Sequence, residues 1–301
     1  MSWIVEESDN TSAVNLNGDT ITCTKDGYYG SPINVMYSDS ASENGQYFWQ
    51  IEFEQMSEQG GASVGFTTDD SFKSGWYLKG MQYLGNLSDG SGLLVSSFGD
   101  RIKENDKVGL LLQLSDADLK IYIFHNERPL GLAFHVSSPY PKPLYPVVSF
   151  SSNGKVKISR AQQTPTSLER SPEEFTGVEG NWRIIDYPSH PECIDCKFAI
   201  SKESPNVYGL HAHVVNSMNC SLEYDPANDQ WKSSPILRTR KGGPPEAMKK
   251  EDLICKLIAD IQGLEAQGEQ HLVIRTSGGD QVRLERFTVP APQPVTQNIF
   301  N

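Results

Sequence analysis

The sequence has few cysteines, no long apolar runs and few basic residues, and each shortage excludes a class of protein. Five cysteines in 301 residues, odd in number and widely scattered, do not form a disulfide scaffold. No apolar run approaches the roughly 20 residues that a membrane helix needs. The first residues, Met-Ser-Trp-Ile-Val-Glu-Glu, lack the basic start and apolar stretch of a signal peptide. We therefore expect a cytoplasmic protein with reduced thiols.

Acidic residues outnumber basic ones by 38 to 26, which gives a formal net charge of −12. An acidic surface repels phosphate groups, so we expect neither nucleic acid nor a membrane as a partner. Two common enzyme motifs are also missing, since the sequence has no Gly-x-x-x-x-Gly-Lys and no His-Glu-x-x-His. We therefore expect a protein that is not an enzyme and that uses no cofactor. With 37% hydrophobic residues, the chain can still bury a core.

Residues 1–160 consist of short apolar stretches separated by turn residues. In the run Tyr47-Phe-Trp-Gln-Ile-Glu-Phe-Glu, every second side chain from Tyr47 to Phe53 is apolar, as a half-buried strand requires. Asp-Gly and Asn-Gly pairs recur between such stretches, and no helical period is evident. Many short strands at near-regular spacing predict an all-β sandwich.

The stretch from Tyr47 to Ala161 resembles a SPRY domain. The segments that carry the likeness, in the order of the family, are Tyr47-Phe-Trp-Gln-Ile-Glu-Phe, Ser63-Val-Gly-Phe-Thr, Ile102-Lys-Glu-Asn-Asp-Lys-Val-Gly-Leu-Leu-Leu, Leu119-Lys-Ile-Tyr-Ile-Phe-His-Asn-Glu-Arg-Pro-Leu-Gly-Leu-Ala-Phe and Pro143-Leu-Tyr-Pro-Val-Val-Ser-Phe. The resemblance implies a concanavalin-like jelly roll that binds a protein or peptide through loops at one end of its sheets. Asn126-Glu127 stands where the family has Asn-Gly. Because Glu resists the positive φ of a type I′ turn, we expect another type of turn there.

Three segments match the binding loops of that family by position: residues 26–32, 75–80 and 151–154. Aromatic side chains in loops are costly to expose and are enriched in binding hot spots. The alternative, that these aromatics cap the ends of the sandwich core, stays open, and so does binding of a glycan or small ligand by the same loops. The residues predicted to contact a partner are Tyr28, Tyr29, Trp76, Tyr77, Tyr83, Ser152 and Asn153.

A polar stretch with two prolines, residues 161–178, predicts a linker to a second domain over residues 179–289. After Pro244-Pro245, apolar residues from Leu253 to Ile261 recur at helical spacing and predict a helix. Gly263 stands where a left-handed helix stop is expected. Residues 290–301 predict a flexible tail, although Ile299 and Phe300 could dock.

Parts of this second half resemble META-type domains, which are small α+β units with an antiparallel sheet and one helix. The likeness rests on Gly180-Asn-Trp-Arg-Ile, on the segment from Asn216 to Tyr224, and on Ile236-Leu-Arg-Thr-Arg before the predicted helix. The resemblance implies a shape and no chemistry. The sequence does not indicate which partner the chain binds or its oligomeric state.

The one cluster with metal-like spacing joins Cys193 and Cys196 to His211 and His213. Zinc takes four nitrogen or sulfur ligands, and a Cys-x-x-Cys pair is a common half-site. On a strand, His-x-His places both rings on one face. Three interpretations remain open: a loop pair of cysteines beside ordinary strand residues, a zinc site, or a redox pair.

Overall fold

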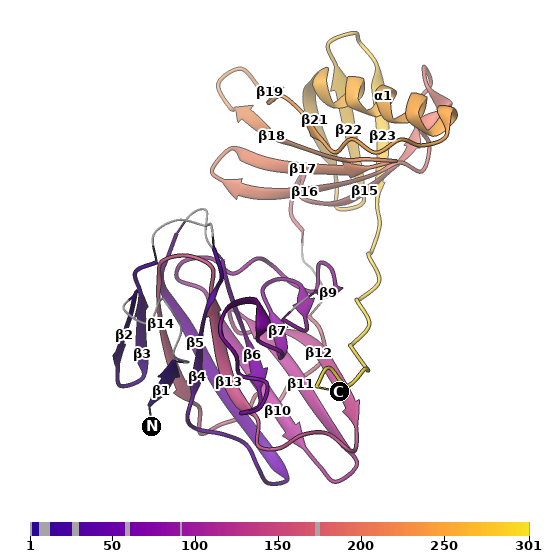
Figure 1. The fold of residues 1–301 in the computed structure, drawn as a ribbon. Helices are drawn as coiled ribbons and strands as arrows, with labels where there is room; N and C mark the ends of the chain where they lie inside the picture. The colour runs from indigo at the N-terminus through magenta and orange to yellow at the C-terminus, as the bar shows by residue number, and fades with distance from the viewer. Residues whose placement is uncertain are drawn as a thin grey trace. The chain divides into compact units, whose positions relative to one another are not determined.

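The computed structural model describes residues 2–5, 13–25, 30–57, 61–90, 92–171 and 175–300 (Figure 1). The chain forms two compact units: unit 1 comprises residues 1–172 and 291–301, and unit 2 comprises residues 173–290. Each unit has a hydrophobic core of its own. Among the described residues, no helix has the length and apolar character to cross a membrane.

Unit 1 is built from two antiparallel sheets, and the all-β character predicted for this half is confirmed. The first sheet has the order β1-β4-β13-β6-β7-β8-β9 and the second β12-β11-β10-β5-β14-β3-β2. The strands of the first sheet are β1 (Trp3–Val5), β4 (Ile33–Tyr37), β13 (Tyr145–Phe150), β6 (Ala62–Thr67), β7 (Met81–Tyr83), β8 (Leu87–Ser88) and β9 (Leu93–Val95), with the short 3-10 helix η2 (Gly75–Tyr77) between β6 and β7. Those of the second are β12 (Arg128–Ser137), β11 (Asp118–His125), β10 (Lys107–Leu114), β5 (Gly45–Met56), β14 (Gly154–Arg160), β3 (Thr20–Cys23) and β2 (Val14–Asn17).

The alternation of side chains along the strands explains why the two sheets pack face to face. On β5, the predicted apolar face is buried, and Trp49, Ile51 and Phe53 have no exposed surface. Trp49 contacts Phe66 of the opposite sheet edge to face, with ring centroids 5.4 Å apart. Strands of both sheets therefore contribute to one apolar cluster between them.

The hairpin between β11 and β12 corrects one prediction. Asn126 and Glu127 both have positive φ, 50° and 66°, so this two-residue loop has the type I′ signs that Glu was expected to avoid. Hydrogen bonds hold the turn in place: Asn126 accepts one from the Lys107 amide and donates another to Asp106. These bonds offset the cost of the left-handed backbone at Glu127.

The segments predicted as a linker and as a flexible tail both contact the sandwich. Leu168 packs against a small apolar cluster that contains Phe48 and Phe124, and the Ser171 amide donates to the carbonyl of Pro129. At the other end of the chain, Val295 forms a parallel bridge with Phe134 of β12. Both segments therefore pack on the sandwich, although their composition is polar and rich in proline.

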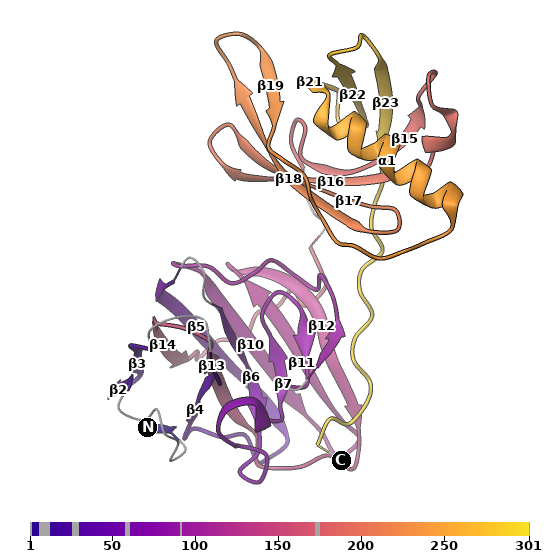
Figure 2. The same ribbon diagram turned by 45° about the horizontal axis from the view of Figure 1, so that its top comes forward.

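Unit 2 is a curved antiparallel sheet with helix α1 (Pro245–Ala259) lying across one face (Figure 2). The strand order is β19-β18-β17-β16-β15-β23-β22-β21, and β20 also pairs with β18. Its strands are β15 (Gly180–Asp186), β16 (Lys197–Ser204), β17 (Val207–His213), β18 (Ser217–Asp225), β19 (Gln230–Ser233), β20 (Leu237–Arg238), β21 (Ile261–Gln267), β22 (His271–Thr276) and β23 (Gln281–Arg286), with the 3-10 helix η3 (Pro191–Cys193) between β15 and β16.

Helix α1 ends earlier than the apolar period predicts, because Ile261 and Gly263 belong to β21. Its buried residues Ile254, Leu257 and Ile258 join the core of unit 2. The apolar residues continue from α1 into the half-buried strand β21, so their spacing does not show where the helix ends.

A buried carboxylate ties α1 to the sheet. Glu251 has no exposed surface and accepts hydrogen bonds from the backbone amides of Val215 and Asn216, at 3.0 and 2.6 Å, and from the Asn216 side chain at 2.9 Å. The oxygen of the same Asn216 side chain accepts bonds from Thr239 and from the Lys241 amide. Glu251 therefore links the helix to the turn between β17 and β18, and Asn216 extends that link to the segment before the helix.

Candidate binding site

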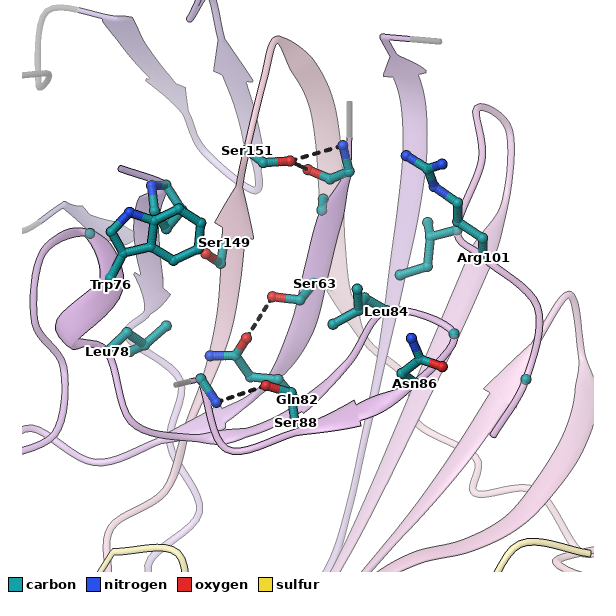
Figure 3. Close-up of a pocket in the computed structure, with 18 of the residues that line it drawn as sticks. Ser63, Trp76, Leu78, Gln82, Leu84, Asn86, Ser88, Arg101, Ser149 and Ser151 are labelled. Carbon is teal, nitrogen blue, oxygen red and sulfur yellow. Dashed lines mark hydrogen bonds between the residues drawn. The ribbon is translucent and has the colours of Figure 1, made fainter. Parts of the chain in front are cut away.

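A pocket of about 570 Å³ lies on the face of the first sheet that points away from the core of unit 1. Its floor carries the polar side chains of Ser63, Gln82 and Ser149, which alternate with core residues along β6, β7 and β13. Each of these three strands therefore turns an apolar side chain inward and a polar one into the pocket. Figure 3 shows Trp76 and Leu78 on one side of this floor.

Gln82 is the most informative residue of the floor. The side chain is 5% exposed, and its Oε1 accepts a hydrogen bond of 2.7 Å from Ser63 Oγ. Among the described residues, Nε2 donates no hydrogen bond, and it is not one of the fully buried unpaired side-chain atoms, so it is open to the pocket. An amide donor that faces the pocket can pair there with water or with an acceptor of a ligand, so Nε2 is available for ligand binding.

The first wall of the pocket is the segment that includes η2, and a buried amide holds it. The Asn34 side chain, 3% exposed, donates to the carbonyls of Lys73 and Gly75 and accepts from Ser149 Oγ. Gly75 has φ +57°, and a Cβ there would lie 2.9 Å from Cβ of Ser31. A side chain at this position would therefore be strained and crowded. These contacts fix the backbone from which Trp76, 63% exposed, projects beside the floor.

The opposite wall consists of residues between Leu84 and Ile102. Asn86 Oδ1 accepts a hydrogen bond of 2.7 Å from the Ser97 amide, and the Gly99 amide donates to the carbonyl of Gly85. Figure 3 shows Leu84, Asn86 and Arg101 on this side. The two walls are thus held by separate hydrogen bonds, and the space between them is preformed.

Tyr83, predicted to contact a partner, instead supports this second wall from the core. It has no exposed surface, and its hydroxyl lies 2.9 Å from the carbonyl of Asp100 and 2.7 Å from His125 Nδ1. His125 Nε2 in turn lies 2.9 Å from Asp106 Oδ2. Burial raises the pKa of Tyr83, and the charge of Asp100 adds to the shift. The hydroxyl therefore stays protonated and hydrogen-bonded.

The structure distributes the other predicted contact residues over several places. Trp76 lines the pocket, whereas Tyr77 is 82% exposed beside it and does not contribute to its lining. Ser152 is buried, and Asn153 lines a separate hollow of about 310 Å³. Tyr28 and Tyr29 lie outside the described residues. Only Trp76 of the predicted set is therefore brought to the pocket among the residues that the structure describes.

The floor residues Ser63, Gln82 and Ser149 were not predicted, because the sequence-based prediction placed the site in loops. The available signal was a polar residue at every second position of otherwise apolar strands, as in Ser63-Val-Gly-Phe and Met81-Gln-Tyr. Such positions ordinarily face solvent, and the pattern alone does not distinguish an open surface from the floor of a pocket.

The cysteine and histidine cluster does not come together as a metal site. Cys193 and Cys196 lie in the core of unit 2, whereas His211 and His213 lie on the exposed face of β17. Burial raises the pKa of the Cys193 thiol to about 11. In the described part of the chain, no group of three or more His, Cys, Asp or Glu residues could hold a metal ion. The two cysteines act there as small apolar core residues.

Searches of protein-family models and of curated proteins found no match for this sequence. Three of the solved structures to which the chain is similar are the SPRY domain of human HERC1 (22% identity, TM-score 0.40, covering 49% of this chain and 92% of that one), the PSpry domain of TRIM65 (12%, 0.34, 54% and 93%) and the metal-free carbohydrate recognition domain of Emp46p (12%, 0.32, 52% and 87%). The structures similar to about half of this chain thus include SPRY domains.

Proposed function

We propose that unit 1 is a non-catalytic interaction module that binds an extended segment of a partner protein in the pocket over β6, β7 and β13. The observation that carries the proposal is the amide of Gln82 in the floor of the pocket, whose Nε2 donates no hydrogen bond within the described part of the chain and is open to a ligand. An extended peptide offers a carbonyl oxygen at every residue, which is the acceptor that this nitrogen requires.

One wall of the pocket adds an apolar contact to the polar contact at Gln82. The exposed indole of Trp76 and the adjacent Leu78 form an apolar side against which a ligand side chain can be buried. Trp is among the residues most enriched in binding hot spots. A volume of about 570 Å³ falls within the range of roughly 300–1,000 Å³ that is typical of small-ligand sites. The pocket therefore suits a few residues of a partner rather than a broad protein surface.

At the level of the whole chain, we propose a cytoplasmic adaptor with two modules. The sequence resemblance to SPRY domains supports the role of unit 1. Unit 2 is a separate unit with a core of its own, and we propose it as the second contact surface of the same adaptor.

The proposal is tested by selecting peptides on the protein from a displayed random library. We expect the selected peptides to share a motif, and we expect Trp76→Ala to weaken their binding at least tenfold. Trp76 is 63% exposed, so its loss leaves the fold intact. The matched control is Leu237→Ala, which removes a side chain that is 74% exposed in unit 2.

Two results would contradict the proposal. In the first, the selected peptides bind the Trp76→Ala protein as tightly as the wild type, which would move the site elsewhere. In the second, no peptide motif emerges while an oligosaccharide on a glycan array binds in a Trp76-dependent manner. That outcome would replace a peptide ligand by a glycan in the same pocket.

A further inference from the structure

After unit 2 the chain returns to unit 1, and we call residues 291–300 the returning segment. Val295 is its point of attachment to β12. The Val295 amide donates a hydrogen bond of 2.8 Å to the carbonyl of Ala133, and the His135 amide donates one of 2.8 Å to the carbonyl of Val295. These two bonds flank Phe134 in a parallel bridge. The returning segment thus adds a short parallel partner to β12, the last strand at one edge of its sheet.

Apolar side chains reinforce this attachment. Val295 and Ile299 are 7% and 8% exposed and belong to the core cluster of unit 1, which also contains Phe134 and Val136. Phe300 packs against the same cluster. Burial of these apolar side chains stabilises the attachment and offsets part of the entropy lost when the chain is ordered.

The stretch before this attachment holds no strand. Residues 287–294 have no regular secondary structure, and they include Pro290, Pro292 and Pro294, which lack an amide donor. Proline-rich stretches of this kind remain extended and semi-rigid. The returning segment is therefore joined to the sandwich between Val295 and Phe300, where the Asn298 side chain also donates to the carbonyl of Pro139. The connection before it follows Phe287, whose amide donates to the carbonyl of Asn181 within unit 2.

We propose that the free edge of β12 and the adjacent apolar site form a peptide-docking groove, and that its occupant is the returning segment of the same chain, bound as an exchangeable intramolecular ligand. Addition of a strand to a sheet edge is an established mode of peptide recognition, in which backbone bonds supply affinity and side-chain pockets supply specificity. Here the specificity elements are Val295 and, four residues later, Ile299 followed by Phe300. The proposal does not depend on the pocket over β6, β7 and β13.

The groove has a consequence for the connection between the two units. The chain leaves unit 1 near residue 172 and comes back at residue 291. While the returning segment is docked, unit 2 is connected to unit 1 at both of its ends. Once the segment is released, one connection remains. Because the returning segment belongs to the same chain, its docking is intramolecular, and a modest intrinsic affinity suffices.

The first test uses the full chain with both apolar contacts removed, as the double variant Val295→Asp, Ile299→Asp. The probe is a fluorescent peptide that corresponds to residues 289–300. We expect the double variant to bind this peptide at least tenfold more tightly than the wild type does, because the wild-type groove is already occupied. The control protein is Val289→Asp, whose side chain is 51% exposed outside the returning segment, and it should behave as the wild type. A peptide with Asp at both contact positions should not bind.

A second measurement applies if the double variant does not fold. A protease site inserted between Pro290 and Ala291 of the otherwise unchanged chain allows the connection to be cut after folding. We expect the labelled peptide, added in excess, to replace the cut segment in unit 1. If the cut segment stays bound and no labelled peptide enters, the segment is a fixed part of the core and the proposal is overturned. Dimers of the uncut protein held by exchanged segments would overturn its intramolecular part.

Discussion

Two tyrosines near the pocket differ in role, although both lie in turn-rich sequence. Tyr77 is 82% exposed, whereas Tyr83 is buried with its hydroxyl between the Asp100 carbonyl and His125. The sequence presents both as candidate binding residues because both are aromatic and flanked by glycine. Only the pairing of β7 with β6 and β8 places the Tyr83 side chain in the core.

The two tyrosines therefore respond differently to mutation. We expect Tyr83→Phe to lower the free energy of unfolding by about 1–3 kcal/mol, because it leaves buried groups without their partner. Tyr77→Ala should change it by less than about 0.5 kcal/mol, because its side chain is 82% exposed, and should weaken peptide binding less than Trp76→Ala does, because Tyr77 does not line the pocket. Urea denaturation of both variants, together with the binding assay above, measures these effects. A large loss of stability in Tyr77→Ala would show that this residue is part of the core.

Glu127 has a left-handed backbone that glycine adopts more readily. We expect Glu127→Gly to raise the free energy of unfolding by about 1 kcal/mol, because a residue with a Cβ costs roughly 1–2 kcal/mol at positive φ. Glu127→Ala is the matched control, since it removes the same carboxylate and keeps the Cβ. Equal stabilities of the two variants would show that the backbone at Glu127 carries no such cost.

At the scale of elements, helix α1 is attached through Glu251. Burial raises the pKa of this carboxyl. The hydrogen bonds donated by Asn216 and by the Val215 amide lower the pKa by a larger amount, so it lies below its usual value. A carboxyl whose pKa is lower in the folded chain contributes stability above its unfolded pKa of about 4.3. That contribution is lost as the pH falls through the folded pKa.

We expect Glu251→Gln to lower the free energy of unfolding at neutral pH by about 2 kcal/mol, because an amide nitrogen would face groups that also donate. The variant should also lose less stability than the wild type between about pH 5 and pH 3, since it lacks the carboxyl that titrates there. The matched control is Asp252→Asn on the same helix, which breaks a surface ion pair with Arg238 and should cost less than about 1 kcal/mol. Parallel pH profiles of wild type and Glu251→Gln would contradict this account.

The strands and helix α1 were predictable because each has a side-chain period that burial imposes. The alternation in β5 and the helical spacing up to Ile258 are examples. The second wall of the pocket was not predictable, since it depends on which strands become neighbours. For the returning segment, the sequence indicated that Ile299 and Phe300 could dock, which is confirmed, but not that they join the core beside β12. The floor is an intermediate case: Ser63, Gln82 and Ser149 are visible as polar positions, but their convergence requires the order β13-β6-β7.

At the scale of the whole molecule, each of the two units has a separate core, and their stabilities should respond separately. We expect Ile299→Asp to destabilise unit 1 by at least about 2 kcal/mol, the cost of removing a buried Ile side chain, and to leave unit 2 unchanged. Hydrogen exchange followed by mass spectrometry reads the two units independently. Val289→Asp serves as the control. Equal loss of protection in both units would show that they unfold as one.

The central claim, that a partner segment occupies the pocket beside Trp76, is tested most directly by tryptophan fluorescence. Trp76 is 63% exposed, while the other four tryptophans are between 0 and 7% exposed, so an aqueous quencher such as acrylamide acts mainly on Trp76. We predict that a saturating selected peptide lowers the quenching slope to that of the Trp76→Phe variant. A slope that stays at its peptide-free value while the peptide is bound would contradict the claim.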